Sequence, residues 1–162
     1  MKPNPVRLLD FSQPLYKVEM LNASAVSPEF HFHDECQITL VITGNGKKMV
    51  GDSVTQFEPG ELVLVGPGLP HVWATSEGAE LEGSITAMNL LFGAEWLFKL
   101  LVPAAGAVEL NRMLTLAERG LIFYGKTKEK LVAVLWKLSV AKDIDRLILL
   151  LEVIKIVGST DE

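Results

Sequence analysis

Two different spacings of apolar residues divide the chain near residue 92. Up to Phe92, short runs rich in Val, Ile, Thr and Leu alternate with Gly, Pro, Asn and Asp. Short strands separated by turn residues about every eight to twelve positions are typical of a β-sandwich or β-barrel. After Phe92, apolar residues recur every three or four positions, as on one face of an α-helix. The pattern predicts a β domain over residues 1–92 and a helical segment over 93–162.

Most strands of the first part are bounded by recognisable turns. Residues 1–13 contain two prolines and are expected to form an arm that packs over the mouth of the β domain. Asn45-Gly46 is the strongest short hairpin signal in the chain and predicts a tight turn between paired strands. Strands are expected at residues 15–20, 31–43, 47–50, 54–57, 62–65 and 72–75, with one or two more within 81–92.

The second part predicts four helices. They are expected at residues 94–101, 110–119, 127–140 and 143–157. Thr127 and Asp143 have side chains suited to capping the N-termini of the last two. Trp96 and Trp136 lie at helical spacing with leucines and are expected in the core.

The last of these helices is apolar over more than half of its circumference. A helix that is apolar nearly all round is buried on more than one side. We therefore expect a homodimer, because a symmetric pairing of this helix would bury the same patch on both subunits. The alternative is a groove within one subunit, between the β domain and the preceding helix. The residues expected at the dimer interface are Ile144, Leu147, Leu150, Leu151 and Ile154.

Composition agrees with a globular chain that does not bind nucleic acid by itself. The 162 residues carry a net charge of −5, with no block of Lys or Arg, whereas DNA-binding domains usually present a basic face. The single cysteine, Cys36, excludes an intrachain disulfide and a cysteine-based zinc site. The start of the sequence does not resemble a signal peptide, and no apolar run is long enough to span a membrane, so we expect a cytoplasmic protein without membrane partners.

The residues best suited to bind a ligand or a metal lie in two short segments, His31-Phe32-His33-Asp34-Glu35-Cys36-Gln37 and Gly66-Pro67-Gly68-Leu69-Pro70-His71. These segments contain all three histidines of the chain. Alternate side chains of a strand share a face, so several of these polar groups would surround one small bound group or ion. The third imidazole would come from another strand. The expected binding residues are His31, His33, Glu35, Gln37, His71 and Trp73.

This set is compatible with two kinds of site. Imidazole is a good ligand for Fe, Mn, Zn and Ni, so His31, His33, Gln37 and His71 could hold a divalent metal. Alternatively, the same groups form hydrogen bonds in a ligand pocket or are half-buried structural residues. Gln37 is a neutral, poor metal donor, and Glu35 could replace it only if the strand has no bulge. Cys36 falls on the opposite strand face from His33, and Glu58 and Glu61 are expected at solvated positions.

The two histidine segments resemble the two motifs of the cupin superfamily. His31, His33, Gln37 and Gly44 match the first motif, with Gln37 where the family has Glu. Gly60, Gly68 and His71 match the second, with Gly66 and Thr75 in place of its Pro and Asn. The resemblance implies a mainly β fold with C-terminal α, namely a cupin (double-stranded β-helix) barrel followed by a small helical dimerisation subdomain.

The run from His31 to Trp73 more narrowly resembles the N-terminal sensor domain of AraC-type transcription regulators. That resemblance implies a non-enzyme that binds a small effector, such as a sugar, in the barrel and pairs two subunits through a C-terminal helix. DNA would be contacted only through a helix-turn-helix domain, which this chain does not contain. Such sensors generally work without a metal, so no resident cofactor is expected. The alternative is a stand-alone cupin metalloenzyme of the dioxygenase or sugar isomerase type.

Overall fold

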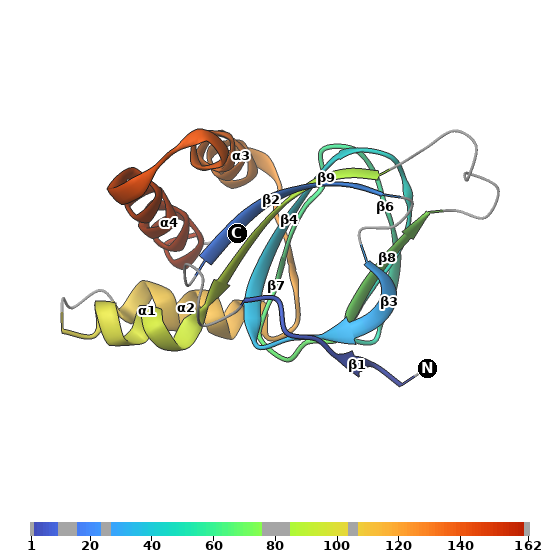
Figure 1. The fold of residues 1–162 in the computed structure, drawn as a ribbon, viewed down its shortest axis with the longest axis horizontal. Coiled ribbons are helices and arrows are strands. Elements are labelled where there is room, and N and C mark those ends of the chain that lie inside the picture. Colours follow the sequence, from blue (N-terminus) through green and yellow to red (C-terminus); the bar gives the residue numbers. More distant parts are fainter. Residues whose placement is uncertain (1, 10–15, 24–26, 76–84, 104–106, 161–162) are drawn as a thin grey trace.

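In the part of the chain that the structure describes, two five-stranded sheets curve toward each other and form a barrel, with four helices packed against one side (Figure 1). The computed structural model describes residues 2–9, 16–23, 27–75, 85–103 and 107–160. The first sheet has the order β1 (Asn4–Pro5), β3 (Ser27–Phe32), β8 (His71–Thr75), β5 (Gly46–Val50) and β6 (Ser53–Phe57). The second has the order β10 (Leu121–Ile122), β7 (Leu62–Val65), β4 (Glu35–Thr43), β9 (Ile85–Gly93) and β2 (Tyr16–Ala23).

Nearly all of these strands pair in antiparallel fashion. The exception among the described strands is β1, which pairs in parallel with β3 and places Asn4 beside His31. The expected arm is therefore partly a strand. β7 is buried along its whole length, as its apolar run predicts.

Two apolar layers hold the fold together. One fills the barrel and includes Val41, Val63 and Trp73. The other lies between the second sheet and the helices and includes Ile38, Leu64 and Leu90. Alternation along β4 explains the division, because Ile38 points toward the helices while Val41, beyond it on the strand, points into the barrel.

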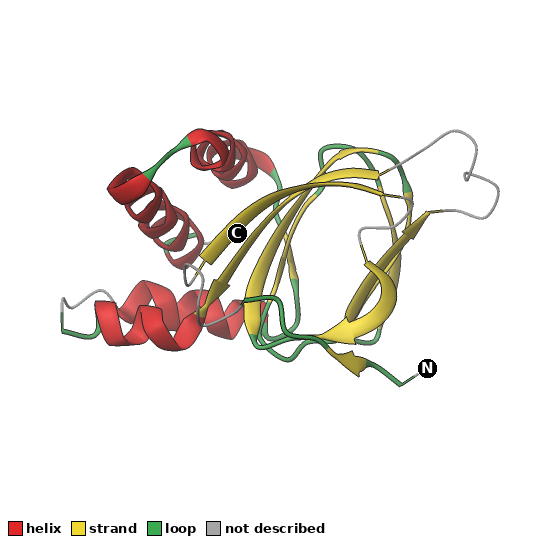
Figure 2. Cartoon of the chain, viewed as in Figure 1, coloured by secondary structure: helices red, strands yellow, loops and turns green. Residues whose placement is uncertain are grey.

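The four helices cover the outer face of the second sheet (Figure 2). They are α1 (Ala94–Leu101), α2 (Ala107–Ala117), α3 (Gly125–Val140) and α4 (Asp143–Gly158). α2 ends at a turn in which Gly120 has a positive φ of 74°, as expected for a C-terminal cap. α4 approaches α2 so closely that a Cβ on Gly158 would lie 2.4 Å from the backbone oxygen of Glu109. Residue 158 is consequently restricted to glycine unless the helices move apart.

The predicted Asn-Gly hairpin is wrong, because β4 and β5 belong to different sheets. Residues 44–46 instead carry the chain from one sheet to the other. Gly46 is required for close packing, since a Cβ there would lie 2.1 Å from the backbone oxygen of Ala74. The tight hairpin is at Gly51-Asp52, where Val50 pairs with Ser53 and Gly51 has a φ of 60°.

Both predicted helix N-caps are also wrong. Tyr124 occupies the N-cap position of α3, so Thr127 lies inside the helix. Asp143 is the first residue of α4, and the N-cap residue is Lys142, which makes no capping side-chain hydrogen bond. Trp136, expected in the core, is 47% exposed.

The structure divides the five residues predicted at the dimer interface. Leu150 and Ile154 are buried inside the chain, in the layer between the second sheet and the helices. Ile144 is exposed, while Leu147 and Leu151 are half-buried at the edge. The predicted stripe is therefore wrong at Leu150 and Ile154. The sequence could not orient the helix because nearly every face is apolar.

Among the described residues, none of the helices has the length and apolar character needed to cross a membrane.

A buried histidine cluster in the barrel

The three histidines meet at one end of the barrel. His31 is the second-last residue of β3 and the register partner of His71 at the start of β8, and His33 lies in the bend that leads into β4. Ring centroids are 4.4 Å apart for His31 and His71, and 4.8 Å for His33 and His71. One ring nitrogen from each residue lies within 4.8 Å of the others, and all three side chains are buried. The predicted convergence is confirmed.

Each imidazole is oriented by a backbone carbonyl group. Nδ1 of His31 donates to the oxygen of Glu29 (2.9 Å) and Nδ1 of His71 to that of Leu69 (2.8 Å), while Nδ1 of His33 lies 3.0 Å from the oxygen of Glu35. A carbonyl oxygen only accepts, so Nδ1 of His31 and of His71 carries a proton and, in a neutral ring, Nε2 keeps its lone pair. Nε2 of His33 faces the amide oxygen of Gln37, which also only accepts, so a neutral His33 can donate to only one of its two oxygen neighbours. The same arrangement orients histidine ligands in metal sites.

Burial keeps two of the rings uncharged. It lowers the pKa of His71 to about 3, with a smaller contribution from the neighbouring imidazoles. Burial also lowers the pKa of His33, although hydrogen bonding to Gln37 and the negative charge of Glu35 act in the opposite direction. Both rings are therefore neutral near pH 7, the form that can accept a hydrogen bond or coordinate a metal.

Gln37 continues the cluster as a polar chain across the barrel wall. Its Oε1 lies 3.1 Å from Nε2 of His33, and its Nε2 donates to Oγ1 of Thr39 (2.8 Å). Thr39 in turn donates to Oδ1 of Asn89 on β9 (2.9 Å). This chain fixes the position of Gln37 beside the cluster.

Glu35 connects the cluster to the arm. Its Oε1 accepts a hydrogen bond from the backbone nitrogen of Leu9 (3.0 Å), whereas its Oε2 is buried without a hydrogen-bond partner, 3.5 Å from Nδ1 of His33. The arm therefore passes over the histidine end of the barrel, as predicted.

Trp73 and a buried ion pair line the barrel further along. The ring centroid of Trp73 is 5.5 Å from that of His71, so the predicted neighbours do share a face. Lys48 is the register partner of Trp73, and its Nζ donates to Oε2 of Glu61 (2.7 Å). The solvated position expected for Glu61 is wrong, because its carboxylate is paired with this buried lysine.

In addition to Oε2 of Glu35, two ring nitrogens at the cluster have no hydrogen-bond partner among the described residues. Nε2 of His71 and Nε1 of Trp73 are buried and make no hydrogen bond. Leaving a buried polar atom unpaired is costly, and such an atom in a native protein needs an explanation. The two rings are neighbours, with centroids 5.5 Å apart, so an unpaired acceptor and an unpaired donor suit a bound group that satisfies both.

The histidine set also fits a divalent metal. Three imidazoles whose ring nitrogens lie within 4.8 Å of one another, one of them with an unpaired Nε2, are ligands that Zn²⁺, Fe²⁺, Mn²⁺ or Ni²⁺ would accept. Gln37 fits less well, because its amide oxygen already contacts Nε2 of His33 and carries no charge.

Sequence reasoning missed Thr39, Asn89 and Lys48. Thr39 follows Gln37 by two residues and shares its strand face, and Asn89 is the polar residue within the apolar run of β9. Those signals could have indicated the first two. Lys48 could not be placed, because its role depends on the register between β5 and β8.

Comparison with known proteins identifies the barrel. Residues 17–85 match the model of the Cupin domain family. The match runs from β2 to the first residue of β9, and the predicted fold class, a mainly β cupin barrel with C-terminal helices, is confirmed. No curated protein sequence matches the chain.

Matches to solved structures extend beyond the barrel, as two examples show. Apo ToxT from Vibrio cholerae matches with a TM-score of 0.53 at 12% identity, covering 94% of this chain and 54% of ToxT. The AraC-like transcriptional activator CuxR matches with a TM-score of 0.50 at 15% identity, covering 78% of this chain and 41% of CuxR. The chain thus spans about half of ToxT and less of CuxR. A cupin 2 conserved barrel domain protein from Salinispora arenicola has a TM-score of 0.43 at 18% identity, covering 56% of this chain and 73% of that protein. The expected likeness to AraC-type regulators therefore holds for the fold.

Proposed function

We propose that this chain is the effector-sensing module of an AraC-type transcription regulator. A small effector binds in the barrel at the cluster of His31, His33 and His71, and its binding controls an attached DNA-binding domain. The fold shared with the AraC-like activator CuxR supports the regulator class. The orphaned Nε2 of His71 and Nε1 of Trp73 carry the proposal of a ligand at this end of the barrel.

The chemistry of the site favours an effector that carries hydroxyl groups. One hydroxyl can accept from Nε1 of Trp73 and donate to Nε2 of His71, which satisfies both orphaned atoms. Sugars present several hydroxyls on an apolar ring, and the ring would meet the aromatic face of Trp73. Binding would shift the population of arm and helix arrangements, because only a state with a formed pocket gains these contacts.

The first prediction tests this site. Sugars and polyols that raise the melting temperature of the native chain should have at least tenfold weaker affinity for His71→Gln, because glutamine cannot reproduce the imidazole Nε2 in its place. Calorimetric titration measures the affinity. Glu58→Gln, an exposed turn substitution, serves as the control and should bind like the native chain. If the native and His71→Gln chains bind with equal affinity, the histidine cluster does not take part in effector recognition and the prediction is wrong.

A stand-alone cupin metalloenzyme is the second candidate, favoured by the three oriented imidazoles. A metal held by His31, His33 and His71 would supply a Lewis acid for an oxygen-bearing substrate. Metal analysis of the purified chain separates the two proposals. One equivalent of metal, lost in His71→Gln together with turnover, supports the enzyme. Effector binding by protein treated with a chelator supports the sensor.

A further inference from the structure

The loop between β7 and β8 contacts two of the three histidines directly. This histidine loop (residues 66–70) precedes His71, the first residue of β8. The oxygen of Leu69 accepts a hydrogen bond from Nδ1 of His71 (2.8 Å). The nitrogen of Gly68 donates to the oxygen of His33 (2.7 Å). A displacement of either histidine therefore acts on the loop.

The histidine loop is also joined to the C-terminal end of α2. The nitrogen of Leu69 donates to the oxygen of Gly66 (3.3 Å), and the nitrogen of Gly66 donates to the oxygen of Ala117, the last residue of α2 (3.1 Å). A Cβ on Gly66 would lie only 2.7 Å from that same oxygen. The last carbonyl groups of a helix have no partner within the helix, and here the loop supplies one. The loop and the end of α2 are thus bonded and in close contact.

The N-terminal half of α2 holds the last described residues of the chain. Nη2 of Arg112 donates to the oxygen of Thr160 (2.7 Å), and Thr160 is buried. Gly158 packs directly on the backbone of Glu109. The hydroxyl of Thr160 lies 3.2 Å from that of Thr127 on α3. Residues 158–160 are therefore fixed between α2 and α3.

α2 is a stiff connection between these two sets of contacts. From Glu109 to Ala117 the helix rises by about 12 Å. Leu110, Met113 and Ala117 are buried along its inner face. Closely packed protein interiors have low compressibility and transmit strain. A displacement at one end of α2 therefore reaches the other end.

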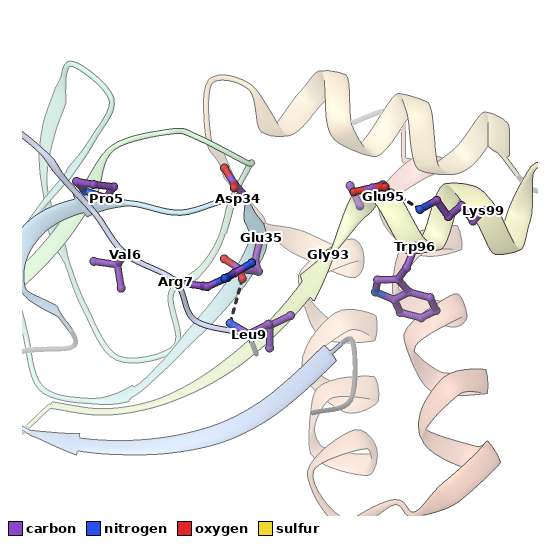
Figure 3. A pocket seen from close by; sticks show the side chains of 11 residues that line it. Pro5, Val6, Arg7, Leu9, Asp34, Glu35, Gly93, Glu95, Trp96 and Lys99 are labelled. Atoms are coloured by element: carbon purple, nitrogen blue, oxygen red, sulfur yellow. Dashed lines mark hydrogen bonds and ion pairs between the residues drawn. The ribbon is translucent and has the colours of Figure 1, made fainter. Parts of the chain in front are cut away.

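The arm contacts the histidine cluster through a different residue. Oε1 of Glu35 accepts a hydrogen bond from the backbone nitrogen of Leu9, and Figure 3 shows this bond at the start of β4. The arm thus contacts the cluster through Glu35, whereas α2 contacts it through the histidine loop. The two connections can be perturbed separately.

From these contacts we propose that α2 couples the histidine cluster to residues 158–160. A bound group that moves His33 or His71 moves the histidine loop, and α2 then shifts Arg112 and the segment that it holds. A DNA-binding domain joined after residue 162 would take its orientation from this segment. That regulatory use rests on the proposed function, whereas the coupling itself does not.

An alanine substitution at the junction tests the coupling without any ligand. In Gly66→Ala the added Cβ pushes against the oxygen of Ala117, and position 66 has no positive φ that alanine would strain. Native-state hydrogen exchange of the whole chain, followed by NMR, should show the amides of residues 158–160 exchanging at least fivefold faster relative to the amide of Ile38 in β4. Ile85→Val removes a methyl group inside the barrel and controls for a general loss of stability. It should leave that ratio unchanged.

The reciprocal experiment starts from the other end of α2. Arg112→Ala removes the bond to Thr160 and should speed the exchange of the Gly68 and Leu69 amides at least threefold, because a coupling between two sites acts in both directions. Asn111→Ala, at the adjacent exposed position of α2, is the matched control and should change neither amide.

Two results would overturn the proposal. One is a folded Gly66→Ala chain in which residues 158–160 exchange at the native ratio. The other is an effect of Arg112→Ala on the histidine loop no larger than that of Asn111→Ala. Should Gly66→Ala not fold, the comparison of Arg112→Ala with Asn111→Ala decides. No effector enters either experiment, so failure of the effector proposal would not alter the outcome.

Discussion

Cys36 and His33 lie three positions apart in the sequence but in different chemical environments. His33 belongs to the polar cluster at the barrel end, whereas Cys36 packs with Ile38 and Leu40 in the layer beneath the helices. The opposite faces predicted for these two residues are confirmed. At the residue scale, the alternation of side chains along a strand decides which of them lie on the same face and can interact.

The surroundings of Cys36 make its thiol unreactive. Burial raises its pKa to about 12, and the negative charge of Glu35 adds to the increase. Because the thiolate is the nucleophile, a raised pKa suppresses reaction until the pH approaches that value. We expect negligible reaction with a disulfide reagent in the native chain at pH 8, and complete reaction in guanidinium, where the thiol regains its ordinary pKa.

A matched variant controls for access and reagent quality. Ser53→Cys in a Cys36→Ala background places the thiol in an exposed hairpin position and should react within the mixing time. Rapid, stoichiometric labelling of native Cys36 at pH 8 would contradict the burial described here.

At the scale of secondary-structure elements, α3 and α4 leave apolar surface exposed. Trp136 and Val140 lie in the last turns of α3, and Ile144 and Ile148 in the first turns of α4, all more than 45% exposed. Apolar area left in water costs about 25 cal/mol for each Å². We propose that this surface, and not Leu150 or Ile154, pairs two copies of the chain.

Two aspartate substitutions on α4 separate this surface from the core. Ile148→Asp should give a folded monomer, because the side chain is exposed and its charge would disrupt only a contact between subunits. Leu150→Asp should lower the unfolding free energy by several kcal/mol, because it places a carboxylate in an apolar layer.

Analytical ultracentrifugation and circular dichroism distinguish the outcomes. A native chain that sediments as a monomer at high concentration would end the dimer proposal. Unfolding of Ile148→Asp would instead assign its side chain a role inside the subunit.

At the scale of the whole molecule, the sequence predicted the architecture because its apolar patterns differ so clearly on either side of residue 92. The spacing of the two motifs also predicted that His31, His33, Gln37 and His71 lie at one site. The Lys48–Glu61 pair and the orientation of α4 were beyond sequence reasoning. The first depends on register between strands distant in the chain, and the second on choosing among equally apolar faces.

The net charge leads to a prediction for the whole chain. With a charge of −5 and no basic stripe, it lacks the phosphate contacts that supply most nonspecific DNA affinity. Selection from a randomised duplex pool at about 150 mM salt should therefore give no enriched sequence. Enrichment that weakens steeply with added salt would mean that the cupin module itself reads DNA.

The short parallel strand β1 also has a consequence for solubility. An open strand edge offers unpaired backbone groups to other chains and promotes aggregation. β1 covers the edge of β3, and Val6 extends the cover by donating to the oxygen of Phe32 (2.9 Å). β1 is itself only two residues long, and Pro5 has no N–H to offer a neighbouring strand. The arm thus protects the sheet from edge-to-edge association between molecules.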